Sequence, residues 1–216
     1  MPQDRSAHPM KSAWCTVVVG IALTTGCSGG TDHQGNDFQS AREVCGGLSE
    51  TGAHALEAIA ATKEFSSSPS TGKFDMPENV SKEFTGPPAE SRHDLCTIEP
   101  ENVRNDQRIG FSFKVLSTLP PAPNKLLHGN VYFKVGLRAW ATTLGARLYF
   151  TCQPSKAPAD KRRARVVQTD FWYAPASRGK VSYKGNMELL NEASYKLAKQ
   201  LSCSESAGLS QELDGS

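Results

Sequence analysis

Three stretches in the middle of the chain alternate apolar and polar residues with a period of two, which restricts the fold strongly. The apolar positions are Ile109, Phe111, Phe113 and Val115 in residues 108–117, Val131, Phe133, Val135 and Leu137 in 131–138, and Leu144, Ala146, Leu148 and Phe150 in 143–152. Successive side chains of a strand point to opposite faces of a sheet, so this alternation predicts antiparallel strands with one wet face. Residues 164–173 predict a fourth strand whose two faces are less distinct.

Helical patterns flank the predicted strands. Ser49 is predicted to cap a helix that ends near Thr62, and Asn186 is predicted to cap a second helix that ends before Cys203. The apolar stripe of the second helix consists of Met187, Leu190, Ala193, Leu197 and Leu201. The order helix, strands, helix predicts an α+β domain: an antiparallel sheet of about four strands with the N-terminal and C-terminal helices packed on one face. Residues 66–91 are rich in Ser, Pro and Gly and predict a mobile surface excursion, with a short helix near residues 78–84.

The N-terminus has the pattern of an export signal. Residues 15–23 form an apolar run of about nine residues, too short to cross a hydrocarbon core that needs about twenty. Thr24-Thr25-Gly26-Cys27 and the small polar residues 28–30 follow this run. This leader resembles the lipobox signal of bacterial lipoproteins, although Thr24 stands where that family usually has Leu.

The resemblance implies a lipid anchor. In bacterial lipoproteins the signal is cut just before the cysteine, whose thiol carries diacylglycerol and whose amino group is often acylated, commonly with palmitate. Carried over, Cys27 is the lipidated residue and Gly26–Cys27 the cleaved bond, which places the protein on the outer, extracytoplasmic face of the cell membrane. Ordinary secretion with an unmodified Cys27 is the alternative. A hypothetical start at Met10 would place Lys11 before the apolar run, as is typical of such signals.

Four regions follow from these patterns. Residues 1–26 are the predicted signal peptide, 27–44 a flexible tether, 45–203 a single α+β domain and 204–216 a disordered tail. The leader contains two of the cations and one of the anions of a chain whose formal net charge is +2, so the mature chain would carry +1. A charge this close to zero argues against nucleic acid as a partner.

Four cysteines remain in the mature chain besides Cys27. Widely spaced cysteines in even number in an exported domain predict two disulfides. Metal ligation is the competing interpretation, but the sequence has no C-x-x-C pair and no convincing His–Cys ligand set, and no cofactor is expected. Three pairings are possible, and the sequence does not choose among them, although sequential pairing would close the shorter loops. The sequential pairs are Cys45–Cys96 and Cys152–Cys203.

A second resemblance covers most of the mature chain. The layout is similar to a group of actinobacterial lipoproteins of unknown function, which share a lipobox with a Ser-Gly tether and a final helix that ends in cysteine. Their helix start is similar to Cys45-Gly46-Gly47-Leu48-Ser49, without a spacer residue that the group has, and their mid-chain motif to Leu95-Cys96. These motifs are structural, so the resemblance implies no activity.

The sequence contains no recognisable catalytic constellation. His93, beside Asp94, and His128, in a loop, would be solvated or locally hydrogen-bonded groups in the simplest interpretation. An envelope hydrolase that uses one of them in a site formed only by the fold is the alternative.

Two features are candidates for binding. The basic residues Lys161, Arg162, Arg163 and Arg165 would contact anionic lipid headgroups or wall polymers, at about 1 kcal/mol per cation, or would only blunt a sheet edge. Trp140 and Trp172 would line a ligand cleft or pack on the sheet surface. The sequence thus favours a lipid-anchored binding or interaction module of unknown ligand, with a hydrolase or a purely structural envelope protein as alternatives.

Overall fold

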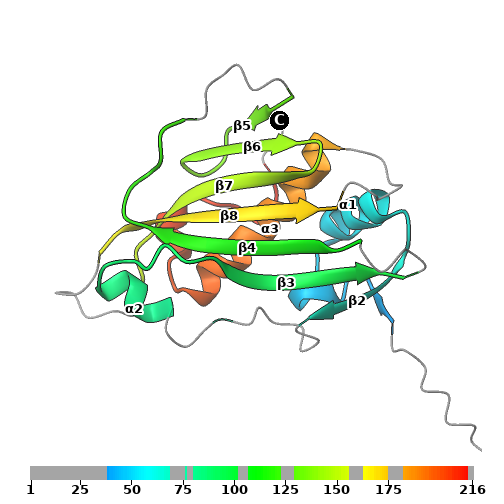
Figure 1. Cartoon of the computed structure of the whole chain (residues 1–216), viewed down its shortest axis with the longest axis horizontal. Coiled ribbons are helices and arrows are strands. Elements are labelled where there is room, and N and C mark those ends of the chain that lie inside the picture. Colours follow the sequence, from blue (N-terminus) through cyan, green and yellow to red (C-terminus); the bar gives the residue numbers. More distant parts are fainter. Residues whose placement is uncertain are drawn as a thin grey trace, which may run out of the picture. The chain divides into compact units, whose positions relative to one another are not determined.

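A computed structural model describes residues 38–68, 76, 80–101, 107–122, 129–155, 163–174 and 182–213. Within these residues, eight strands form one antiparallel sheet in the order β1-β2-β3-β4-β8-β7-β6-β5 (Figure 1). The strands are β1 Gln39–Ser40, β2 Glu64–Ser68, β3 His93–Pro100, β4 Ile109–Leu116, β5 Val131–Phe133, β6 Arg138–Thr142, β7 Gly145–Cys152 and β8 Arg165–Tyr173. The helices are the 3₁₀ turn η1 Val44–Gly46, α1 Glu50–Ala60, α2 Val80–Thr85, α3 Tyr183–Gln200 and α4 Ser204–Ala207.

The sheet confirms the α+β class but is wider than the sequence predicted. The strands predicted over 108–117, 143–152 and 164–173 are confirmed as β4, β7 and β8. The predicted strand 131–138 is wrong in its extent, because the chain bends over residues 134–137, where Gly136 has a φ of 59°, and separates β5 from β6. Val131 and Leu137 are exposed despite their place in the apolar pattern. The remaining strands lack a long alternating pattern and are recognised only by their pairing.

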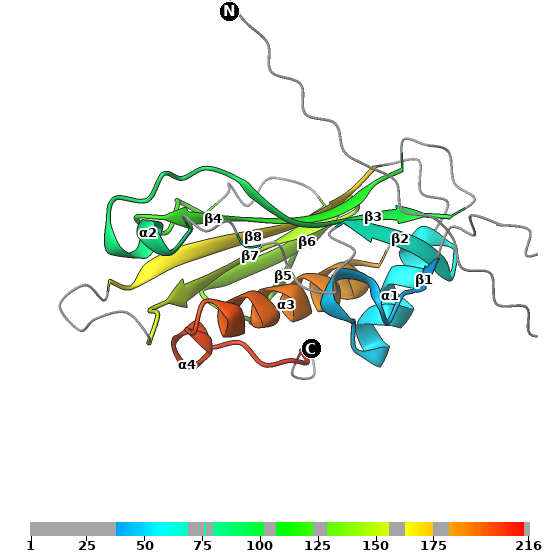
Figure 2. The ribbon, with the colours of Figure 1, turned by 90° about the horizontal axis from the view of Figure 1, so that it is seen from below.

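Helices α1, α3 and α4 lie on one side of the sheet (Figure 2). The core between them is formed by inward residues of the strands and by one face of each long helix. Its largest fully buried side chains include Phe111, Phe113, Phe150 and Phe171 from the sheet, Leu56 and Ile59 from α1, and Met187 from α3. At about 25 cal/mol per Å² of apolar area, burial of these side chains is the main stabilising contribution to the fold.

The predicted N-cap is confirmed for one long helix and is wrong for the other. Ser49 caps α1 as predicted, because its hydroxyl accepts a hydrogen bond from Gly52 N at 3.1 Å. The cap predicted at Asn186 is wrong, since Ser182 caps α3 by accepting from Gly185 N at 2.9 Å. Asn186 is instead fully buried and donates from Nδ2 to Thr142 O at 2.9 Å, which ties α3 to the β6–β7 turn.

Both disulfides are present with the sequential pairing. Cys45–Cys96 joins η1 to β3, and Cys152–Cys203 joins the end of β7 to the chain just after α3. Disulfides persist in oxidising compartments, so the pair indicates an extracytoplasmic environment.

The ordered domain extends beyond both ends of the predicted 45–203 region. Before Cys45, β1 pairs with β2, and Ala41 and Val44 are buried. The tail predicted to be disordered over 204–216 instead packs over residues 204–213: α4 forms, Leu209 and Leu213 contact the core, and Ser210 O accepts from Asn191 Nδ2 at 2.9 Å.

The predicted signal peptide, Gly26, Cys27 and residues 28–37 of the predicted tether lie outside the described residues. No helix in the described part of the chain is long and apolar enough to span a membrane.

Candidate functional site

The sheet face opposite α1 and α3 carries a row of six side chains from six strands. Residues directly opposite in the register are neighbours on one face of the sheet. Here the register pairs each member of the row with the next, in the order Asp94, Ser112, Asp170, Arg147, Trp140 and Tyr132. A second row on the same face, displaced by two residues along each strand, consists of Lys114, Gln168, Tyr149 and Arg138. Polar and aromatic side chains from distant parts of the sequence therefore lie side by side.

A groove with a volume of about 400 Å³ opens on this face, within the range of small-molecule sites, about 300–1,000 Å³. Its charged and aromatic lining residues are Arg92, Lys114, Trp140, Arg147, Asp170, Phe171 and Trp172; Thr142, Leu144, Gly145, Ala146 and Gln168 complete it. We call this feature the groove.

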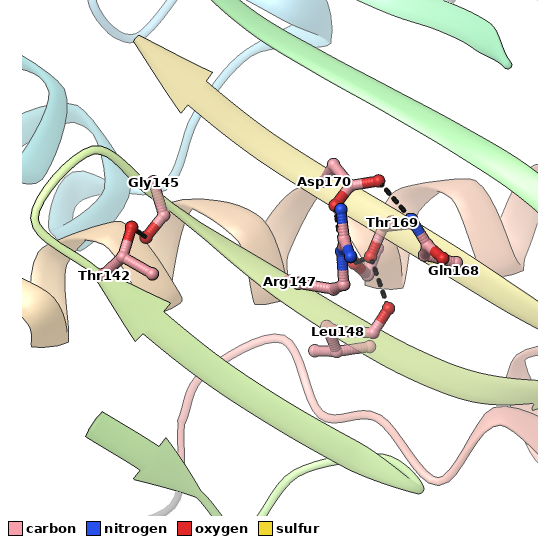
Figure 3. A network of polar contacts seen from close by, with 8 residues as sticks. Thr142, Gly145, Arg147, Leu148, Gln168, Thr169 and Asp170 are labelled. Atoms are coloured by element: carbon pink, nitrogen blue, oxygen red, sulfur yellow. Dashed lines mark hydrogen bonds and ion pairs between the residues drawn. The ribbon is translucent and has the colours of Figure 1, made fainter. Parts of the chain in front are cut away.

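Two residues of the groove lining, Arg147 and Asp170, form an ion pair (Figure 3). Arg147 Nε donates to Asp170 Oδ1 at 2.5 Å, and Gln168 Nε2 donates to Asp170 Oδ2 at 2.6 Å. Burial alone would lower the pKa of Arg147, but the Asp170 carboxylate outweighs it and raises that pKa. Arg147 is thus a permanent cation, and both oxygens of Asp170 are engaged.

Each tryptophan of the groove has a guanidinium over its ring. Arg92 Cζ lies 5.6 Å from the ring centroid of Trp172, and Arg147 Cζ lies 5.8 Å from that of Trp140. These distances are typical of cation–π contacts, which fix the orientation of the guanidinium. Trp140 also contacts Tyr149 and Tyr132, with ring centroids 5.7 Å and 6.3 Å apart.

Glycines flank Trp172 on both neighbouring strands, and one of them makes room for its indole. Gly110 on β4 and Gly145 on β7 are its direct neighbours in the register. A Cβ atom at Gly110 would overlap the indole ring, and one at Gly145 would overlap Phe171 O. The indole therefore lies flat against the sheet at Gly110, where only glycine fits.

The β6–β7 turn at the rim of the groove is fixed from the core side. Tyr173 Oη donates to Thr143 O at 2.5 Å, and Asn186 Nδ2 donates to Thr142 O. Buried residues of β8 and α3 thus hold the turn that contributes Thr142, Leu144 and Gly145 to the groove. On the groove side, Leu116, Trp140 and Tyr149 form a second apolar cluster, and burial raises the pKa of Tyr149.

The predicted binding residues have different outcomes. Trp140 and Trp172 both line the groove, and both also pack on the sheet surface, Trp172 against Gly110 and Trp140 with Leu116 and Tyr149. Lys161 and Arg162 are outside the described residues. Arg163 is exposed, whereas Arg165 begins β8 and donates from Nη2 to Gly86 O at 2.5 Å. Neither Arg163 nor Arg165 lines the groove.

His93 belongs to a buried polar cluster that does not have the geometry of a catalytic triad. Its Nε2 lies 2.8 Å from Glu83 Oε1 and 3.5 Å from Ser91 Oγ. A histidine base contacts its nucleophile and its orienting carboxylate through different ring nitrogens, and here both partners contact the same one. The side chains of His93 and Glu83 are 9% and 6% exposed, so the pair serves to hold α2 against β3. His128 lies outside the described residues.

No sequence pattern groups Arg92, Lys114, Arg147, Gln168 and Asp170. Each strand offers wet-face positions, but which of them meet depends on a register between strands far apart in the chain. In the described residues, no cluster of His, Cys, Asp or Glu has the make-up of a metal site. Comparisons with models of known families, with curated proteins and with solved structures found no match to this chain.

Proposed function

We propose that this protein is a lipid-anchored extracytoplasmic binding module of the cell envelope, with the groove as its ligand site. The observation that carries the proposal is the groove itself: about 400 Å³ lined by two tryptophans and three cations. Sites of this size combine apolar walls with a few placed polar groups. The hydrolase alternative gains no support from the cluster around His93, where Ser91 and Glu83 share one ring nitrogen.

The anchor in this proposal is a lipid on Cys27, supported by the lipobox resemblance and by the two disulfides. Residues 27–37 would connect the lipid to β1, and a flexible chain of that length spans about 18 Å in root-mean-square terms. The domain that carries the groove would therefore be tethered to the membrane surface.

Intact-mass analysis of the protein from its native membrane fraction tests the anchor. We expect a mature N-terminus at Cys27 that carries acyl mass, with all four other cysteines oxidised. A chain that is unmodified at Cys27, or freely secreted, would contradict the anchor.

Retention by native envelope fragments tests the groove. We expect Lys114→Glu to weaken retention, because it reverses a charge in the groove lining. Lys63→Glu is the matched control, since Lys63 is exposed and lies outside the groove. Equal retention of both variants and the parent protein would show that the groove is not the binding site.

The basic residues Lys161, Arg162, Arg163 and Arg165 are proposed as a separate contact with anionic lipid or wall polymer. Charge reversal of these residues is expected to weaken pelleting with anionic vesicles at low salt, where surface charges are least screened. The test variant reverses the charges of Lys161, Arg162 and Arg163 but keeps Arg165, because Arg165 also donates a hydrogen bond to Gly86 O. Unchanged pelleting would remove this contact from the proposal.

A further inference from the structure

The groove has more hydrogen-bond donors and positive charge than its own residues use. Arg92, Lys114 and Arg147 line it, and Asp170 is the one carboxylate in the lining. Both oxygens of Asp170 already accept hydrogen bonds, from Arg147 and Gln168. Trp172 Nε1 is a buried donor without an acceptor among the described residues, but it lies against Gly110 and is not counted among the groove donors. A ligand that complements this lining must bring acceptors and negative charge.

The stacking of the two arginines argues against a neutral sugar as the ligand. Sugars bind to open aromatic faces, but guanidinium groups lie over the rings of both Trp140 and Trp172. Stacking leaves the in-plane N–H groups of a guanidinium free to bind an anion. The ion pairs use Nε of each arginine, Arg92 with Asp94 at 3.1 Å and Arg147 with Asp170. Arg147 also has a side-chain hydrogen bond with Tyr149. The terminal nitrogens of Arg92 make no hydrogen bond to a described residue.

Lys114 is the third cation and has no carboxylate partner among the described residues. It lies on β4, two strands from Arg147 on β7. Along β4, Lys114 is two residues from Ser112, which belongs to the same row as Arg147. Strand spacings of about 4.8 Å and rises of about 3.4 Å per residue place the two Cα atoms about 12 Å apart. Two long side chains span that separation with room for one small anion between them.

We infer that the groove binds a phosphoryl group, held by Arg92, Lys114 and Arg147. This inference rests on the proposed function, in which the groove is the binding site. A phosphoryl group has several terminal oxygens and up to two negative charges, so it engages three cations at once. A carboxylate or a phosphodiester, with one charge and two free oxygens, would engage at most two of the three cations, so the phosphoryl group is a monoester. The phosphomonoester belongs either to a lipid of the phosphatidic acid type or to a soluble molecule.

Tryptophan fluorescence of the mature protein tests the inference. Of the three tryptophans, Trp14 lies in the predicted leader, and Trp140 and Trp172 both line the groove. The protein is titrated in neutral detergent micelles with glycerol 3-phosphate or glycerol, and separately with micelles that contain phosphatidic acid or diacylglycerol. Each pair of probes differs by the phosphoryl group, and ionic strength is matched throughout.

We expect a saturable response to glycerol 3-phosphate or to phosphatidic acid, and none to its partner without the phosphoryl group. The first response identifies a soluble source and the second a lipid source. Lys114→Gln should weaken the response about tenfold, the loss of one charge-assisted hydrogen bond. Lys114→Arg should restore it, which separates loss of charge from misfolding, and Lys63→Gln should not change it.

Two results would overturn the inference: no saturable response to either phosphoryl probe, or a response that Lys114→Gln leaves unchanged. If retention by envelope fragments still depends on the groove in that case, the ligand is of another class and the proposed function stands. If retention does not depend on the groove, the proposed function itself fails.

Discussion

The buried carboxylate of Glu192 on α3 binds the N-terminus of α1. Its side chain is 2% exposed and accepts hydrogen bonds from Ser49 N at 2.6 Å and from Ser49 Oγ at 2.7 Å. Lys196 Nζ lies 3.0 Å from Oε1 of the same carboxylate and also donates to Gly47 O. The carboxylate thus sits at the N-terminus of α1, where the helix dipole favours negative charge. Gly52 is required beside it, because a Cβ atom there would overlap Glu192 Oε2.

Replacing Glu192 with Gln is expected to lower the free energy of unfolding by about 1–3 kcal/mol, because it weakens charge-assisted hydrogen bonds in a buried site. Urea denaturation with the disulfides intact measures the change. Glu205→Gln is the control, since Glu205 is exposed on α4. Equal midpoints for the two variants would contradict a structural role for the Glu192 carboxylate.

The substitution Gly110→Ala tests the packing of the Trp172 indole against β4. The new methyl group would push the indole off the sheet, so we expect a loss of about 1–3 kcal/mol in unfolding free energy and a shifted tryptophan emission spectrum. The matched control is Gly86→Ala, where a Cβ atom would meet only Lys82 O at 3.4 Å. A Gly110→Ala protein with parent-like emission would show that the indole does not lie against β4.

At the scale of elements, the end of β7 and the end of α3 form one unit. The Cys152–Cys203 disulfide joins them, Gln153 N donates to Ser206 Oγ at 2.9 Å, and Ser155 N donates to Ser202 O at 2.8 Å. The segment after α3 is therefore held against the sheet by several bonds, and α4 forms there. The amphipathic pattern of residues 204–213 is too short to predict this packing, which depends on the partner strand.

Removal of this disulfide by the double substitution Cys152→Ala and Cys203→Ala is expected to lower unfolding stability by about 2–4 kcal/mol, through the larger entropy of the unfolded chain. The two cysteines are 51 residues apart, as are Cys45 and Cys96, so the corresponding double variant of that pair is a comparison with the same loop length. An unchanged urea midpoint in either variant would contradict the contribution of that bridge.

At the scale of the whole domain, the core and the groove are the two faces of the same strands. On β8, Thr169 faces the core and bonds to Ser194 of α3 at 2.6 Å, while its neighbours Gln168 and Asp170 face the groove. The groove is therefore built on strands that pack against α3, and its geometry depends on that packing.

Because the core and the groove are formed by the same strands, we predict that they unfold cooperatively. In the mature protein both remaining tryptophans report on the groove, whereas far-UV circular dichroism reports on helices and sheet together. We expect the two signals to give coincident urea transitions, as in a two-state system. A fluorescence transition at clearly lower urea would mean that the groove loses its structure before the core.

The sequence by itself determined the α+β class, the strands β4, β7 and β8, both long helices and the presence of two disulfides. These features are local: alternation with a period of two, apolar stripes at helical spacing, and the count of cysteines. The lipid anchor is also a prediction from a local pattern, and it remains a prediction.

The tertiary structure alone decided the number of strands, the pairing of the cysteines and the groove. β8 inserts between β4 and β7, which brings Lys114, Asp170 and Arg147 onto neighbouring strands although they are far apart in the chain. The physical reason is that register is set by non-local packing of the inward residues on α1 and α3, and the outward residues follow it. A sequence pattern fixes which face a side chain takes, but only the paired sheet fixes its neighbours.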